Sequence, residues 1–431
     1  MEQSPLRIVV IGAGYAGLLA TVRLAGRVKR DIRRGSISIT LVNAADVFVE
    51  RVRLHQVAAN RAAPQRPIAD ILRGTGVSFI CGTVTRLDTA RHKIEVQTNT
   101  TLKQIGYDKL LYALGSTIDR DRVPGVREYA HVLTPDGPRS AAALRKLLPG
   151  LDANKPGGRL MVCGSGPTGI EAAAEFAESY TNLRVHLVTQ GAFGSFTSRD
   201  VAAYLRQSLQ HLGVTIQEWT TIAELRSAEA LTSSGDVLPY EVCLWAGGFS
   251  VPPLARDAGL AVNEGGQILI DPFMRSISHP DIWAVGDAAY PVEVPGSVVR
   301  MSAFTAVLMG AHGADCLSAV LQGRSPQPFS FVYAGQGIAL GRQRAIGFGL
   351  SPEDRPKRPY FTGRLGYELR ESFVRLLANL PNLERRWPGF FVWLGKGRYA
   401  AARQQERNAV PVPSSIAHPD PSTSSPLRND V

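Results

Sequence analysis

The fold is decided by residues 6–17, which read LRIVVIGAGYAG. The first six residues are apolar except for Arg7 and mostly β-branched, which is typical of a buried parallel strand. Glycines 12, 14 and 17 follow at once, and residues 18–24 (LLATVRL) have the composition of a helix. Gly12 permits a tight turn, Gly14 lets the backbone approach a pyrophosphate, and Gly17 lets helix and strand pack closely. Because the helix N-terminus also attracts phosphate, the stretch predicts a dinucleotide site.

The next strand of this unit, residues 38–42 (SITLV), ends at Asn43. An acidic residue usually stands at such a strand end and binds an adenosine ribose. Asn43 can still bond a hydroxyl group, and Asp46, just beyond it, is the alternative ribose ligand.

A second unit of the same form begins at residue 159, where the sequence reads RLMVCGSGPTG. Its glycines are Gly164, Gly166 and Gly169, a helix is expected over residues 170–177, and the partner strand 184–188 ends at Thr189 and Gln190. Two complete units predict two dinucleotides held face to face. The second strand end carries no carboxylate, which leaves room for a 2′-phosphate, and no Arg directly replaces it. The choice between NADH and NADPH therefore stays open.

Bulk properties limit the class of protein. A chain of 431 residues has the length of two or three domains, and its four cysteines are too widely spaced to indicate a metal site or a disulfide framework. The first apolar run leads directly into a glycine turn, so we expect no signal peptide, and no apolar window is long enough to predict a transmembrane helix.

Most of the net charge of +11 lies between residues 342 and 407. This excess indicates anionic lipid, an anionic ligand or simply a solvated basic face; no regular basic stripe indicates nucleic acid.

Two further segments extend the pattern. Residues 107–116 (YDKLLYALGS) have the form of a strand and a small-residue turn, and residues 278–289 (SHPDIWAVGDAA) form a strand ending in Gly286-Asp287. Together with the twin glycine turns, these segments resemble the superfamily of two-dinucleotide flavoproteins, the FAD-dependent pyridine-nucleotide oxidoreductases, over residues 6–345.

Three features make the chain most similar to type II NADH dehydrogenases. No Cys-x-x-x-x-Cys pair follows the first glycine motif, so chemistry of the disulfide-reductase kind is excluded. Residues 238–248 (LPYEVCLWAGG) resemble the return strand that borders the nicotinamide. The region from Phe329 resembles the membrane-facing domain of that group.

The resemblance implies an α/β fold with two Rossmann-like domains and a C-terminal α+β region. We expect an FAD domain over 1–118 and 262–328, an inserted NAD(P)H domain over 119–261, a C-terminal domain over 329–407 and a disordered tail over 408–431. By the same resemblance, Glu171 is the candidate catalytic residue, close to the nicotinamide; its alternative role is to stabilise a helix dipole. NADH or NADPH would be held by Gly164, Gly166 and Gly169. FAD would be held by Gly12, Gly14, Gly17, Asn43, Asp46, Gly115, Gly286 and Asp287.

One departure from the group concerns the electron acceptor. Type II enzymes carry a pair of glutamines on the helix after the Gly-Asp motif, but here residues 300–312 read RMSAFTAVLMGAH. We therefore expect transfer of reducing equivalents from NAD(P)H to a quinone-like aromatic acceptor, with a specific metabolite of the quinone or quinoline type as the alternative. A redox-sensing flavoprotein without turnover is a third hypothesis. His55 and Gln56, after the second strand, are candidates for the acceptor side, and a solvated or core position is the alternative that their place in the sequence favours.

The C-terminal region bears on location. Residues 383–398 (LERRWPGFFVWLGKGR) are aromatic with basic flanks, which suits a membrane interface, packing on the body of the protein or a homodimer contact. An amphipathic helix is expected over residues 364–380. We expect a cytoplasmic protein, with peripheral contact to the inner face of an anionic membrane as the further hypothesis.

Overall fold

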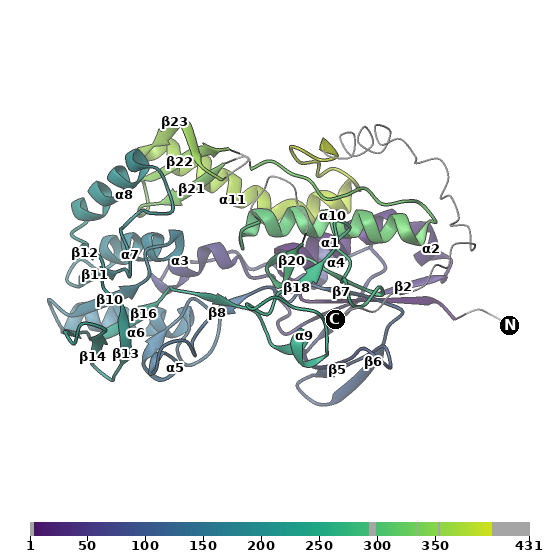
Figure 1. Cartoon of the computed structure of the whole chain (residues 1–431), viewed down its shortest axis with the longest axis horizontal. Coiled ribbons are helices and arrows are strands. Elements are labelled where there is room, and N and C mark those ends of the chain that lie inside the picture. The colour runs from purple at the N-terminus through teal and green to yellow at the C-terminus, as the bar shows by residue number, and fades with distance from the viewer. Residues whose placement is uncertain (1–3, 293–298, 334, 352–353, 399–431) are drawn as a thin grey trace, which may run out of the picture.

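A computed structural model describes residues 4–292, 299–333, 335–351 and 354–398. The chain forms two units that each contain a five-stranded parallel sheet, and a third region lies above both (Figure 1). This arrangement confirms the predicted α/β class with two Rossmann-like units. The expected tail over 408–431 lies outside the described residues.

The first sheet has the strand order β19-β7-β1-β2-β3. Its central strand β1 pairs in parallel with β2 and β7, and β7 pairs with β19, so a strand from late in the chain completes the sheet begun at the N-terminus. The first unit is therefore discontinuous in sequence. Its strands are β1 (Leu6–Ile11), β2 (Ile37–Asn43), β3 (Ser78–Cys81), β7 (Lys109–Tyr112) and β19 (Ile282–Ala284).

The second sheet repeats the design with the order β12-β11-β10-β16-β9. Here β10 is central and pairs in parallel with β11 and β16. The segment expected as one return strand over residues 238–248 is divided: its first part belongs to a small antiparallel sheet, and its second part is β16. The strands are β9 (Ala130–His131), β10 (Arg159–Cys163), β11 (Arg184–Val188), β12 (Thr215–Gln217) and β16 (Val242–Trp245).

Short sheets complete the two units. The chain passes between them at β8 (Thr117–Ile118) and returns at β17 (Phe249–Ser250), and these two strands pair with each other. A pair of parallel strands, β18 (Ile268–Ile270) and β20 (Ala289–Pro291), lies in the first unit. Each unit also carries an antiparallel meander, β4 (Thr83–Asp88), β5 (Lys93–Gln97) and β6 (Leu102–Gly106) in the first, and β13 (Ile222–Leu225), β14 (Glu229–Thr232) and β15 (Val237–Pro239) in the second.

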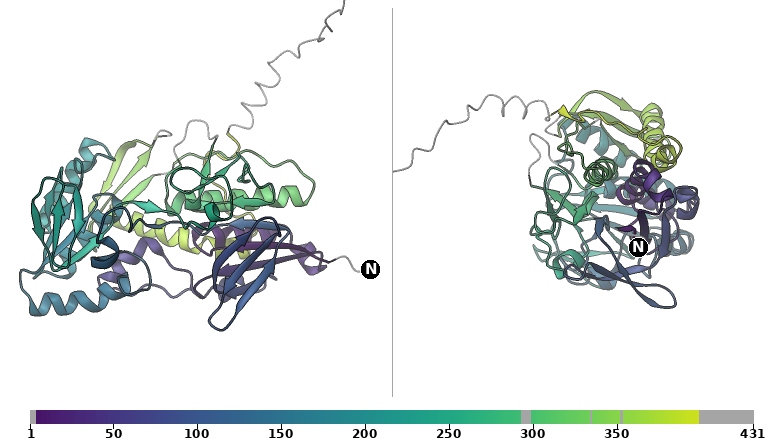
Figure 2. Two further views of the ribbon diagram at one scale, coloured as in Figure 1. Left: turned by 60° about the horizontal axis from the view of Figure 1, so that its bottom comes forward. Right: turned by 90° about the vertical axis from the view of Figure 1, so that its right-hand side faces the viewer.

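The third region combines an antiparallel sheet with the long helix α11 (Gly363–Arg386). Its strands are β21 (Gln336–Ala339), β22 (Ala345–Leu350) and β23 (Pro356–Thr362). The predicted amphipathic helix is thus present and longer than expected. Helix α11 lies against α1 and reaches both units (Figure 2).

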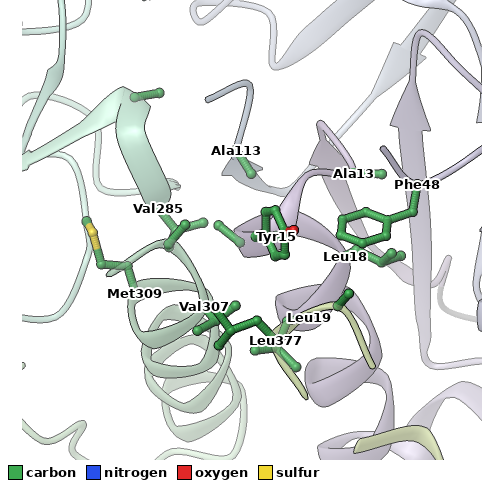
Figure 3. Packing of buried hydrophobic residues seen from close by; sticks show 14 of the residues in the cluster. Ala13, Tyr15, Leu18, Leu19, Phe48, Ala113, Val285, Val307, Met309 and Leu377 are labelled. Atoms are coloured by element: carbon green, nitrogen blue, oxygen red, sulfur yellow. The ribbon is translucent and has the colours of Figure 1, made fainter. Parts of the chain in front are cut away.

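Helices α1 (Tyr15–Arg27) and α10 (Ala303–Leu321) form the most extensive helix contact of the molecule. Gly310 lets them approach, because a Cβ atom there would lie 2.4 Å from the carbonyl oxygen of Ala16. Apolar side chains from α1, α10 and α11 meet between them, among them Leu19, Val307 and Leu377 (Figure 3). Among the described residues, α10 is the one helix long and apolar enough to cross a membrane, but 78% of its most apolar window is buried, as in a core helix.

The remaining helices connect the strands. They are α2 (Lys29–Arg33), η1 (Arg51–Arg53), α3 (Leu54–Ala58), α4 (Ile68–Leu72), α5 (Val126–Tyr129), α6 (Ala141–Asn154), α7 (Pro167–Ser179), α8 (Arg199–His211), α9 (Leu254–Asp257) and η2 (Gly286–Ala288).

Candidate functional site

The first glycine turn joins β1 to α1 with the geometry of a phosphate cradle. Gly12 has a φ of +94°, and a Cβ atom there would lie 2.3 Å from the carbonyl oxygen of Ala113. A Cβ atom on Gly17 would lie 1.9 Å from the carbonyl oxygen of Gly12. Around Gly14, by contrast, nothing lies within 4 Å of a Cβ position, so the turn leaves open space beside the N-terminus of α1. This space fits the pyrophosphate of a dinucleotide.

The second glycine turn, between β10 and α7, repeats this geometry. Gly164 has a φ of +111°, a Cβ atom on Gly169 would lie 1.8 Å from the carbonyl oxygen of Gly164, and the space around Gly166 is open. Both turns therefore present a free helix N-terminus to a phosphate group.

Side chains at the ends of β2 and β11 form hydrogen bonds with the two glycine turns in similar ways. Asn43 accepts a hydrogen bond from the backbone N–H of Ala13 (2.9 Å) and donates one to the carbonyl of Ala45 (2.8 Å). Thr189 shares a hydroxyl–hydroxyl hydrogen bond of 2.7 Å with Ser165. Ala13 and Ser165 hold the same place in the two glycine motifs, so each strand end braces its own turn. Asn43 is thus engaged by protein, whereas the side chain of Asp46 is exposed.

Asp287 lies just after β19 and accepts hydrogen bonds from two polar side chains. The hydroxyl of Ser116 donates to its carboxylate (2.7 Å), and Gln267 donates to its backbone carbonyl (2.9 Å). Burial raises the pKa of this carboxyl, and Ser116 and Arg51 oppose the shift. Gly286 and Gly115, both with positive φ, form the adjoining turns.

Arg51 is a residue of this site that the sequence did not reveal. Its guanidinium donates to the carbonyl of Ser116 (2.6 Å), and its charge acts on Asp287. Its position on a one-turn helix after β2 is a weak signal, because nothing local in the sequence shows that it reaches a loop 65 residues away.

Residues 6–310 match the family model described as pyridine nucleotide-disulphide oxidoreductase. The chain belongs to this family. It is an FAD-containing enzyme that oxidises a reduced nicotinamide nucleotide, as expected. Although the family is named for a disulfide, the cysteines among the described residues are all free.

Curated relatives in the family include NADH dehydrogenase-like proteins. One, from Mycobacterium tuberculosis, is 28% identical over 66% of this chain and 72% of its own length. A demethylphylloquinone reductase from Synechocystis is 26% identical over 81% of this chain and 88% of the relative. Solved structures share the fold: NDH2 of Plasmodium falciparum has a TM-score of 0.73 at 14% identity, covering 90% of this chain and 99% of that one. The sulfide:quinone oxidoreductase of Aquifex aeolicus has a TM-score of 0.72 at 17% identity, covering 88% and 92%.

Glu171, the predicted catalytic residue, lies on α7 next to the second glycine turn. One of its oxygens, Oε1, accepts hydrogen bonds from Arg370 of α11 and from the backbone N–H of Ala339, each at 2.9 Å. No described residue bonds Oε2, which leaves that oxygen available to a ligand. Glu171 is therefore held by the third region of the molecule rather than only by its own helix.

Arg370 begins a chain of buried ion pairs that joins all three regions. It also pairs with Glu371 (2.6 Å), which pairs with Arg53 (2.8 Å), and Arg53 pairs with Glu50 (2.9 Å). All four of these side chains are buried. A buried charge with one partner removed is strongly destabilising, so this chain fixes the relative positions of α7, α11 and η1.

The first turn of α10 contributes Phe304 to an aromatic cluster, at the place where the resemblance to type II enzymes would put glutamine. Phe304 lies between the rings of Tyr333 and Phe373, with centroid distances of 6.0 and 5.8 Å. The guanidinium of Arg300 lies over the Tyr333 ring at 5.1 Å. Phe304 is two residues beyond Ser302, whose backbone lowers the pKa of the Asp287 carboxyl, so the cluster lies close to Asp287.

Proposed function

We propose that this protein transfers reducing equivalents from NAD(P)H through FAD to a quinone-like aromatic acceptor. In the overall reaction, NAD(P)H, a proton and a quinone give NAD(P)⁺ and a quinol. Bound FAD would supply the two-electron redox chemistry, and the protein would supply position and electrostatics. The observation that carries the proposal is the pair of glycine turns, which have matching geometry and belong to one protein with Asp287 beside the first and Glu171 beside the second.

The residues of the chain have distinct roles in this proposal. Gly12, Gly14 and Gly17 would admit the FAD pyrophosphate to the N-terminus of α1, and Asp287, held by Ser116, would bind the flavin's ribityl chain. Gly164, Gly166 and Gly169 would do the same for the nicotinamide nucleotide. Glu171 would offer its free Oε2 to the nicotinamide end, oriented by Arg370.

The names of the relatives support a quinone as the acceptor. The Synechocystis relative is named for demethylphylloquinone, and an Arabidopsis relative, 26% identical over 90% of this chain, is named an NAD(P)H-ubiquinone oxidoreductase. A second candidate is a reductase for one specific aromatic metabolite. The cluster of Phe304, Tyr333 and Phe373 favours it, because aromatic rings stack on planar acceptors but donate few hydrogen bonds.

Anaerobic flavin reduction tests the function. The purified protein should be yellow, and NADH or NADPH should bleach it in the absence of oxygen. Reoxidation by a panel of simple quinones then separates the candidates: turnover with most of them supports the general function, and turnover with none of them supports the specific metabolite. A protein that retains FAD but is not reduced by either nucleotide would contradict both.

We further propose that the third region contacts an anionic membrane surface. Four apolar side chains form an exposed stripe on α11, at helical spacing, and basic residues such as Arg364 and Arg375 lie on the same helix. The segment after α11 adds exposed apolar residues beside Arg386 and Lys396. The exposed set is Leu365, Leu369, Phe373, Leu376, Trp387, Phe390, Val392 and Leu394. Exposed apolar area with basic neighbours is typical of interfacial binding.

Sedimentation with vesicles tests this contact. The protein should pellet with phosphatidylglycerol vesicles and less with neutral ones, and Leu365→Glu with Leu369→Glu should release it. If light scattering instead shows a homodimer that the same substitutions break, the stripe is a subunit interface and the membrane proposal is wrong.

A further inference from the structure

Two buried polar side chains on α3 each have a nitrogen without a hydrogen-bond partner. Nε2 of His55 and Nε2 of Gln56 have none among the residues that the structure describes, and the side chains are only 2% and 5% exposed. Such atoms are rare in folded proteins, because an unmade hydrogen bond in the interior is destabilising. A ligand is a natural partner for such atoms.

The orientation of Gln56 is fixed by its neighbour. Arg53 donates a hydrogen bond to Oε1 of Gln56 at 3.0 Å. Because a guanidinium has donors and no acceptor, the amide oxygen must face Arg53. The unpartnered atom of Gln56 is therefore its NH₂ group, a donor that needs an oxygen or another acceptor.

His55 is a neutral imidazole in this setting. Burial lowers its pKa well below the usual range, and the nearby guanidinium groups of Arg370, Arg61 and Arg53 lower it further, while Glu371 opposes them. A neutral imidazole carries one N–H donor, and in the tautomer that has its proton on Nε2 the unpartnered nitrogen of His55 can donate to an oxygen on which negative charge develops.

These donors lie at the meeting point of the three regions. Helix α3 contacts α7, which carries Glu171, and Arg53 next to it pairs with Glu371 of α11. The glutamines that would donate to a quinone are missing from α10, where Ala303, Phe304 and their neighbours stand instead. Helix α3 thus carries two unpartnered nitrogens, of which that of Gln56 is a donor, whereas the first turn of α10 offers few side-chain donors.

We propose that Gln56 and His55 form the subsite that binds a carbonyl oxygen of the acceptor, replacing the glutamines that α10 lacks. This inference rests on the proposed function and names its substrate class: a planar aromatic compound with a ring carbonyl. As the carbonyl is reduced, its oxygen gains negative charge, and the amide of Gln56, together with His55 in its Nε2–H tautomer, would stabilise it without a buried counter-ion.

The variant Gln56→Glu tests the subsite. A carboxylate keeps an oxygen for Arg53 but replaces the unpartnered donor by an acceptor. We expect kcat/KM for a short-chain benzoquinone to fall by about tenfold or more, since one hydrogen bond to developing charge is lost. Turnover with ferricyanide, which has no carbonyl, and anaerobic flavin reduction by NADH should be unchanged. His55→Phe should show the same split, and Gln210→Glu, on the exposed face of α8, should show none.

The outcomes are distinct. Equal losses with benzoquinone and ferricyanide, or unchanged kinetics with both, would overturn the subsite. Loss of bound FAD or a shifted flavin spectrum in Gln56→Glu would also overturn it, because the amide would then serve the cofactor. Gln56→Met, neutral and of similar size, repeats the test if Gln56→Glu folds poorly. If the unaltered protein is not reduced by NADH or NADPH, the proposed function fails instead.

Discussion

The two glycine turns share their geometry and differ in their surroundings. In each turn the first glycine has a positive φ, the second borders open space, and the third touches the first. In each, a side chain at the next strand end braces the turn. Around the first turn, however, a Cβ atom on Gly12 would lie only 2.3 Å from Ala113, whereas one on Gly164 would lie 3.0 Å from Ala246.

The polar residues around the two turns also make the first site more enclosed than the second. The first site is enclosed by Asp287, Ser116 and Arg51, which bond one another. The second site ends at Gln190, which is exposed, and at Glu171, which keeps one free oxygen. These differences indicate that the first unit is adapted to retain its nucleotide and that the second unit is adapted to exchange its nucleotide.

The substitution of the first glycine in each turn should have the largest effects. Gly12→Ala combines strain from a positive φ, about 1–2 kcal/mol, with backbone overlap at Ala113, so we expect poor folding and loss of FAD. Gly164→Ala carries similar strain but a milder contact, and should remain folded and yellow. Flavin absorbance per protein and the Tm of each variant measure this difference. If both variants lose FAD to the same extent, the two sites are not independent.

The second glycines should separate ligand binding from folding. Gly14 and Gly166 have ordinary φ values of −73° and −68°, and a methyl group meets no protein atom at either place. Gly166→Ala should therefore leave the Tm and FAD content unchanged but raise KM for NAD(P)H by about tenfold, since the methyl occupies the phosphate space. Gly14→Ala should lower FAD content instead, with KM for NAD(P)H unaffected in the fraction that keeps FAD. Steady-state kinetics at known flavin content checks both.

How much of this could be predicted from the sequence depends on the distance between interacting residues. The strand, turn and helix of each unit are local, so residues 6–17 and 159–169 predicted them correctly. Asn43 or Asp46 stays the predicted ribose ligand, but the hydrogen bond from Ala13 to the Asn43 amide is a contact that only the folded sheet creates. The tie between Glu171 and Arg370 spans 199 residues and leaves no periodic signal. Similarly, helical spacing predicted α11 but could not show that four of its apolar residues face outward.

The strand end of the second unit should set nucleotide preference. Because Thr189 and Gln190 carry no charge, we expect the protein to accept NADPH as well as NADH. Gln190→Glu should lower kcat/KM for NADPH by at least about tenfold, since a carboxylate repels a 2′-phosphate, and should leave NADH oxidation intact. The same change at Gln210 is the matched control. An unchanged ratio of the two nucleotides would mean that Gln190 does not face the ribose.

Substitutions of the strand-end side chains that hydrogen-bond to the two turns should have the smallest effects, and the two effects should differ in size. Thr189→Val removes one hydroxyl–hydroxyl bond, but Ser165 is only half-buried and can bond water, so the free energy of unfolding should fall by less than about 1 kcal/mol. Asn43→Leu, the corresponding change in the first unit, leaves the N–H of Ala13 without its acceptor and should cost about 1–3 kcal/mol. Urea unfolding of the FAD-bound protein compares them. A larger loss of stability in Thr189→Val than in Asn43→Leu would contradict this expectation, because the second turn would then depend more on its strand-end hydrogen bond than the first turn does.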